Sequence, residues 1–180
     1  MSATLAMLLL SHLTIAVQAQ SASKDVVDSA RALLQAKQWE ELDKRVASIA
    51  ADDPAWERLP SIVYSAGIAR NDLPAVITRL QQVVETTTRP SNKAAALIVI
   101  GRVHRRQGDG TAAVRVLEQA KSAAPDSPYV EEATGLIYEI EHLSPGLPAP
   151  DINAKSRAGQ PINLAALRGK AVVLVFWGST

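Results

Sequence analysis

Three glycines of this chain, Gly67, Gly101 and Gly135, stand at intervals of 34 residues. Around them, from Lys24 to His142, apolar residues recur at helical spacing between turns rich in proline and aspartate. A fixed interval of this length is typical of repeated helical units that stack on one another. The spacing therefore predicts a mainly α region over residues 24–142.

The segment around Gly101 carries the pattern most fully. Gly101 is followed by Ala113, Ala120 and Pro125, and Gly108-Asp109 lies between as a turn. Small residues at these places allow two helices to approach closely, and the proline ends the second helix before another pair begins. We therefore expect a pair of closely packed helices joined at Gly108-Asp109.

Two further segments look like earlier versions of this unit. Residues 30–54 place Trp39 near a turn and Pro54 at the expected end of a second helix. In the middle unit, Asn71-Asp72-Leu73-Pro74 shortens the turn and Thr86-Thr87-Thr88 ends the second helix irregularly. The pattern resembles the tetratricopeptide repeat, most closely from Ala94 to Ser127. His104 departs from it, since an aromatic residue is usual at that place. The resemblance implies stacked helical hairpins that bind a protein or peptide client.

The N-terminus is typical of a secretion signal. An apolar stretch from Leu5 to Val17 is too short for a comfortable membrane span, and Val17-Gln18-Ala19 follows it. We expect a signal peptide over residues 1–19, a mature chain from about Gln20, and export to the periplasm or another extracytoplasmic compartment. The alternatives are an uncleaved anchor or a buried helix. After cleavage we expect no stable membrane span.

Composition changes after His142. Three prolines in residues 143–150 exclude a helix there and predict a linker. Beyond it we expect a short strand at Asp151-Ile152-Asn153-Ala154, a turn from Ser156 to Gln160 around Gly159, and a short helix capped by Asn163 and ended by Gly169. The apolar run from Ala171 to Trp177 lacks alternation, which favours a central strand covered on both faces.

This order resembles the entrance to the redoxin branch of the thioredoxin fold, over residues 146–180. The matching residues are Gly146, Pro148, Ala149, Pro150, Asp151, Gly159, Leu164, Leu167, Gly169, Lys170, Phe176 and Trp177. The resemblance implies that residues 151–180 begin an α/β domain, incomplete here. It also implies that Phe176, Trp177, Gly178, Ser179 and Thr180 approach an active site whose cysteines lie beyond Thr180.

In TlpA/ResA-like thiol:disulfide oxidoreductases, a Cys-x-x-Cys motif follows such a strand, and its first cysteine is a thiolate at a helix N-terminus. This chain has no cysteine, so it lacks the nucleophile. We expect it to be a fragment of a longer oxidoreductase, with a redox partner protein and no cofactor or metal. Thr180 replaces a frequent tryptophan. Two alternatives stay open: a scaffold without catalysis, and a thiol-dependent peroxidase of the alkyl hydroperoxide reductase/thiol-specific antioxidant (AhpC/TSA) type.

Other polar groups favour structural roles. A net charge of +1 argues against nucleic-acid binding, so Arg102, Arg105 and Arg106 are interpreted as a solvated helix face. Trp39 and Trp56 are expected to pack within hairpins. No metal-binding role is assigned to His12, His104 and His142, because they lack the spacing of metal ligands. The acidic pairs Asp52-Asp53 and Glu131-Glu132 are expected at helix N-termini, where carboxylates are favoured. No catalytic role is assigned to Gly169-Lys170, which precedes a strand, or to Ser179 and Thr180, which have no base nearby.

Overall fold

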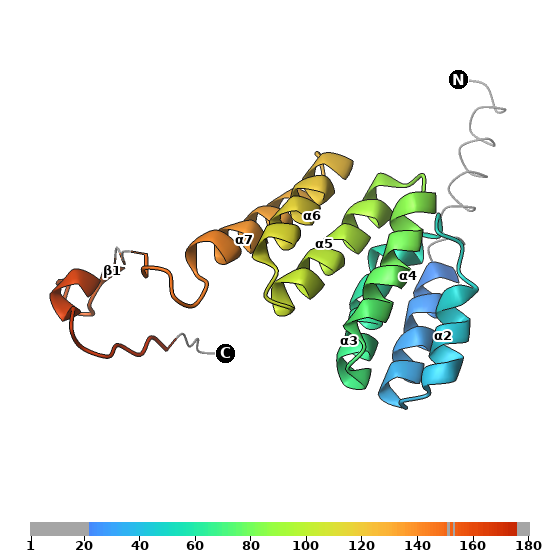
Figure 1. Ribbon diagram of the computed structural model, residues 1–180, viewed down its shortest axis with the longest axis horizontal. Coiled ribbons are helices and arrows are strands. Elements are labelled where there is room, and N and C mark those ends of the chain that lie inside the picture. The colour runs from blue at the N-terminus through green and yellow to red at the C-terminus, as the bar shows by residue number, and fades with distance from the viewer. Residues whose placement is uncertain (1–21, 151, 153, 176–180) are drawn as a thin grey trace, which may run out of the picture. The chain divides into compact units, whose positions relative to one another are not determined.

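The computed structural model describes residues 22–150, 152 and 154–175 (Figure 1). The chain divides into two compact units, Met1–Ile140 and Glu141–Thr180. The described residues are mainly helical, and their sheet is a single pair of two-residue strands. The mainly α architecture expected between Lys24 and His142 is therefore confirmed.

The helical unit is a series of helices joined by short turns (Figure 1). Residues 22–35 are helical, and the elements after them are α2 (Trp39–Ala47), the 3₁₀ helix η1 (Pro54–Glu57), α3 (Leu59–Arg70), α4 (Leu73–Thr86), α5 (Pro90–Arg106), α6 (Gly110–Ala123) and α7 (Tyr129–His142). Residues 143–150 contain no helix, which accords with the three prolines in this segment.

Helix α5 lies at the centre of this unit. It packs against α4 and α6 and also contacts α3 and η1. Each of the seven residues from Ala94 to Ile100 is at most 5% exposed. A helix that is apolar around its whole circumference must be enclosed by neighbours. The core of the unit is therefore built around α5.

Two of the three spaced glycines allow helices to approach closely. A Cβ atom at Gly101 would lie 2.7 Å from Cγ of Leu117 on α6, and one at Gly67 would overlap Val76 on α4. Ala113 and Ala120, on the same face of α6, are fully buried. Gly135 on α7 differs, because apart from its own helix no described residue comes within 4 Å of its Cβ position. The predicted packing role is thus seen at Gly67 and Gly101 and not at Gly135.

The turns before α4 and α6 each contain an aspartate that caps the following helix. Oδ1 of Asp72 accepts the N–H of Ala75 at 3.1 Å, and Oδ1 of Asp109 accepts the N–H of Ala112 at 2.9 Å. These bonds satisfy N–H groups that the first helical turn leaves without a partner. Gly108, with a φ of 83°, supplies the left-handed conformation that ends α5. The predicted turn at Gly108-Asp109 is confirmed.

The first hairpin corrects one prediction. Helix α2 ends at Ala47, and Pro54 begins η1 instead of ending the helix before it. Asp53 caps η1, since its Oδ1 accepts the N–H of Ala55 at 2.8 Å. A proline suits the first position of a helix because it has no N–H to leave unpaired. The prediction that Pro54 closes the second helix is therefore wrong.

The segment between α2 and η1 is held by residues that follow it in the chain. Asp52 accepts the N–H of Thr88 at 2.6 Å and the hydroxyl of Thr87 at 2.9 Å. The fully buried Asn92 donates from Nδ2 to the carbonyls of Ala51 and Asp53, at 2.8 and 2.9 Å. Asp52 therefore fixes the loop after α4, while its neighbour Asp53 caps η1, so the pair lies at a helix N-terminus as predicted.

The unit Glu141–Thr180 contains a small hairpin. Strand β1 (Ala154–Lys155) pairs antiparallel with β2 (Pro161–Ile162), and Ala154 lies opposite Ile162. The N–H of Ser156 donates to the carbonyl of Gln160 at 2.7 Å, and Gly159 has a φ of 79°. The turn is thus confirmed. Of the predicted strand over residues 151–154, Ala154 lies in β1, and Asp151 and Asn153 lie outside the described residues.

A short 3₁₀ helix, η2 (Leu164–Leu167), follows the hairpin. Asn163 caps it as predicted, because its Oδ1 accepts the N–H of Ala165 at 2.8 Å. Gly169, with a φ of 83°, lies in the turn after η2. The apolar run that begins at Ala171 directly follows this turn.

The predicted strand over Ala171–Trp177 is wrong for its described part. Residues 171–175 have no regular secondary structure, and Val173 and Val175 are 85% and 74% exposed. A strand is stabilised by hydrogen bonds to a neighbouring strand, and no described residue forms such a pair with residues 171–175. Phe176 and Trp177 lie outside the described residues.

Candidate binding surfaces of the helical unit

The residues predicted to approach a redox centre, Phe176, Trp177, Gly178, Ser179 and Thr180, lie outside the described residues. The same holds for the predicted signal, residues 1–19. Two of the hollows among the described residues are candidate sites, both within Met1–Ile140. One is a cleft beside α3, and the other is an arginine-rich hollow between α3, α5 and α7.

Two kinds of site are absent from residues 22–150, 152 and 154–175. None of their helices is long and apolar enough to cross a membrane. No group of three His, Cys, Asp or Glu side chains within them is arranged to hold a metal ion. His104 lies in the last turn of α5, and His142 ends α7.

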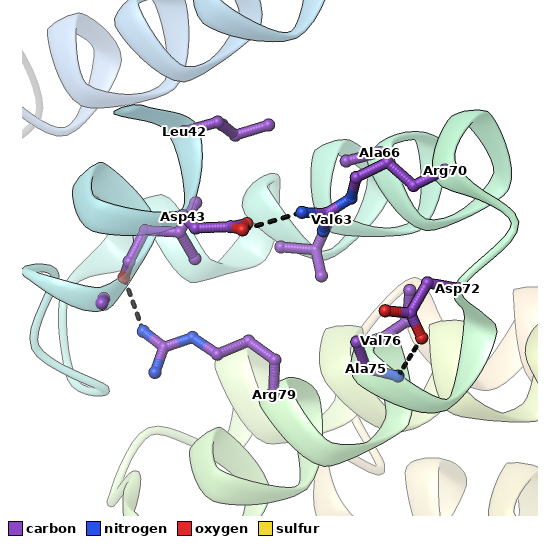
Figure 2. Close-up of a pocket in the computed structure, with 11 residues that line it drawn as sticks. Leu42, Asp43, Val63, Ala66, Arg70, Asp72, Ala75, Val76 and Arg79 are labelled. Carbon is purple, nitrogen blue, oxygen red and sulfur yellow. Dashed lines mark hydrogen bonds and ion pairs between the residues drawn. The ribbon is translucent and has the colours of Figure 1, made fainter. Parts of the chain in front are cut away.

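The cleft lies between α2, α3 and α4 and has a volume of about 270 Å³ (Figure 2). Buried apolar side chains and charged side chains both line it. The apolar ones are Leu42, Val46, Val63, Ala66 and Val76, and the charged ones are Asp43, Arg70, Asp72 and Arg79. The exposed Ala47 and Ala75 complete the lining.

Arg70 joins α3 to α2 across this cleft. Its Nη1 donates to Oδ2 of Asp43 at 2.7 Å, as Figure 2 shows. The guanidinium carbon also lies 5.9 Å from the centroid of the Trp39 ring, within range of a cation–π interaction. The charges of Arg70 and Asp43 therefore compensate each other.

Arg79 has a different environment. Its Nη2 donates to the carbonyl of Val46, near the end of α2, and its Nη1 donates to Oε1 of Gln82 at 3.1 Å. The guanidinium carbon lies 5.3 Å from the centroid of the Trp56 ring. Burial lowers the pKa of Arg79 from its ordinary value. No carboxylate among the described residues forms an ion pair with it.

The α5–α7 arginine surface is a hollow of about 490 Å³ formed by Tyr64, Arg102, Arg105, Arg106 and Leu136. Nη2 of Arg102 lies 2.6 Å from Oε1 of Glu132, and Arg105 forms an ion pair with Glu139. Both glutamates are on α7, so these pairs join α5 to α7. Arg106 is exposed and forms no ion pair within the described part of the chain.

The sequence indicated some of this chemistry and missed the rest. Trp56 is fully buried, so its predicted packing role is confirmed. Arg102 and Arg105 are 38% and 45% exposed, as expected of a solvated face, but their pairing with α7 was missed. Arg70 and Arg79 were also missed. Each contacts a tryptophan from a different helix, so local spacing carried no signal for them.

Comparison of the chain with models of known protein families, with curated proteins and with solved structures finds no match. The two resemblances seen in the sequence thus stay predictions.

Proposed function

We propose that this chain is the client-binding part of an exported thiol:disulfide oxidoreductase, with residues 151–180 forming the beginning of a thioredoxin-like domain. The observation that carries the proposal is the apolar segment 171–175. It follows a hairpin and a capped 3₁₀ helix, and its valines are exposed. An exposed apolar segment of this kind is prone to aggregation, and pairing with strands of a larger domain would cover it.

The order of elements supports the redoxin assignment. The β1–β2 hairpin, η2 with its Asn163 cap, the turn at Gly169 and the apolar segment follow one another as the resemblance implies. In such a domain, a cysteine thiolate attacks one sulfur of a client disulfide and forms a mixed disulfide. A second cysteine then attacks that bond, which leaves the client reduced and the enzyme oxidised.

The helical unit suits a docking role in the same proposal. The close packing at Gly67 and Gly101 and the burial of Ala113 and Ala120 agree with tetratricopeptide-like hairpins. Stacked helical pairs of this kind present extended surfaces for partners. The α5–α7 arginine surface has an exposed arginine beside apolar groups from Tyr64 and Leu136, which fits a protein or peptide client or the redox partner.

The decisive experiment is to determine the coding sequence that follows Thr180 and to assay its full product. We expect a Cys-x-x-Cys motif soon after the apolar run, and reduction of insulin in the presence of dithiothreitol. A variant with the first cysteine changed to serine is the matched control, and it should lose the activity. Peroxide consumption without insulin reduction would favour the AhpC/TSA-type peroxidase.

A second outcome is also informative. If no cysteine follows the apolar run, the oxidoreductase proposal is wrong. The α5–α7 arginine surface would then support the alternative of an exported scaffold, because this surface lies in the helical unit and needs no redox centre. Detection of the mature protein in a periplasmic fraction, with an N-terminus near Gln20, tests the proposed export.

A further inference from the structure

We propose that the cleft between α2, α3 and α4 binds a carboxylate joined to a small branched apolar group, with Arg79 holding the carboxylate. This site is independent of the proposed redox chemistry, since every residue that lines it belongs to the helical unit. The inference rests on the charges at the rim of the cleft, on its apolar walls and on its size.

The charges at the rim leave one cation without a carboxylate. Asp43 is paired with Arg70 at 2.7 Å, and Asp72 accepts the N–H of Ala75 at the N-terminus of α4. Arg79 bonds only to neutral acceptors, the carbonyl of Val46 and the amide of Gln82. Asp72 stands seven residues before Arg79 on α4, which corresponds to about 10 Å along a helix. Arg79 thus has no carboxylate partner among the described residues, and a carboxylate ligand would be the first to pair with it.

Arg79 also has N–H donors that are not used in its own hydrogen bonds. A guanidinium carries N–H groups on three nitrogens, and those on Nη1 and Nη2 exceed the two hydrogen bonds that Arg79 forms. Its Nε is buried and has no partner among the described residues, so the terminal nitrogens are the ones that reach a ligand. A partly buried cation gains more from an anion than an exposed one does, because water screens the attraction less.

The apolar walls of the cleft indicate which kind of group, attached to the carboxylate, would fit there. Val63, Ala66 and Val76 lie at most 9% exposed and face the cleft from α3 and α4 (Figure 2). Branched side chains of this kind favour an aliphatic group and offer an inorganic anion nothing beyond Arg79. The volume of about 270 Å³ accommodates a group the size of one residue and excludes a folded partner.

Two sources supply this chemistry. One is a free branched short-chain acid, and the other is the C-terminal residue of a peptide that ends in leucine. The test therefore titrates the full chain with isocaproate, with a short peptide ending in a free leucine carboxylate, and with the amide of each. Chemical-shift changes at the methyl groups of Val63 and Val76 are followed by NMR.

We expect isocaproate or the peptide acid to shift these methyl signals with saturation, on the order of millimolar affinity. Saturation by the free acid alone indicates a small metabolite, and saturation by the peptide acid indicates a chain end. Both amides should bind at least about tenfold more weakly, because they lack the charge that Arg79 meets. The proposal is overturned if neither acid saturates the signals, or if the amides bind equally well.

Three variants locate the site. Ala75→Leu fills the exposed rim of the cleft and keeps both Arg79 and the N–H that bonds Asp72. Ala112→Leu is its matched control, since Ala112 occupies the same position of α6, donates to Asp109 and does not line the cleft. We expect A75L to weaken binding about tenfold or more and A112L to leave it unchanged.

Arg79→Gln tests the charge and should weaken binding about tenfold. Because it also removes the stacking on Trp56, its unfolding temperature is measured beside that of A75L. If R79Q does not fold, A75L and the amide ligands still decide the question. Equal binding by wild type and A75L places the ligand elsewhere and would contradict the proposal.

Discussion

Leu117 and Val173 are both aliphatic residues in apolar segments, yet Leu117 is fully buried and Val173 is 85% exposed. Leu117 lies on α6, where the helix satisfies its own backbone and turns one face toward α5. Val173 lies in a segment without regular structure, and the strand that we propose there would need hydrogen bonds from a neighbouring strand. The difference shows that a helix carries its order locally, whereas a central strand depends on residues far along the chain.

The largest expected effect is on the free energy of unfolding, compared between a buried helical position and an exposed one in the apolar segment. Leu117→Ala should lower the free energy of unfolding by about 2–5 kcal/mol, since it removes buried methyl groups and leaves a cavity. Leu174→Ala, in the exposed segment, should change it by less than about 0.5 kcal/mol. Urea denaturation followed by circular dichroism gives both values. Similar losses at the two positions would show that segment 171–175 is packed in solution.

A smaller effect compares two glycines of the 34-residue series. Gly101→Ala should cost about 1–3 kcal/mol, because the new Cβ would lie 2.7 Å from Leu117. Gly135→Ala should stabilise the protein by about 0.5–1 kcal/mol, since its Cβ meets no described residue outside its own helix and alanine favours the helix. Thermal unfolding of both variants tests the pair. Destabilisation by G135A would indicate that another element packs on α7.

The smallest effect concerns pH. Hydrogen bonds from the N–H of Thr88 and the hydroxyl of Thr87 hold the pKa of Asp52 below its ordinary value of 3.8. Its carboxylate therefore stabilises the fold above that value, and the contribution is lost as pH falls through the lower, folded pKa. Asp52→Asn should flatten the acid limb of a stability-against-pH curve.

Asp126→Asn, in the turn between α6 and α7, is the control for this measurement. Asp126 is exposed, and we expect its replacement to leave the acid limb as in the wild type. An unchanged limb in D52N would show that Asp52 is not bonded to the loop after α4 in solution.

The sequence predicted the features that depend on neighbouring residues. The cap at Asn163, the turn at Gly159 and the turn at Gly108-Asp109 are each determined by a few consecutive residues. Pro54 was misassigned because a proline both follows helices and begins them, and the cap at Asp53 decides which applies. Local chemistry was thus a sound guide wherever it was unambiguous.

The candidate sites were largely beyond the sequence. The pairs Arg70–Asp43 and Arg102–Glu132 join residues from different helices, and no periodicity connects them. Arg79 was overlooked for the same reason, although the importance of Trp56 for packing was predicted. Contacts of this kind follow from how helices are arranged, so they become visible only once the helices are placed.

The hydrogen bonds of Asn92 bear on the order in which this chain acquires its structure. The carbonyls of Ala51 and Asp53 receive their donor from the first turn of α5. A nascent chain that has emerged only as far as α4 therefore cannot complete the connection between its first helices. During synthesis, the segment between α2 and η1 is therefore fixed only after the start of α5 has left the ribosome, although the helices before it satisfy their own backbones.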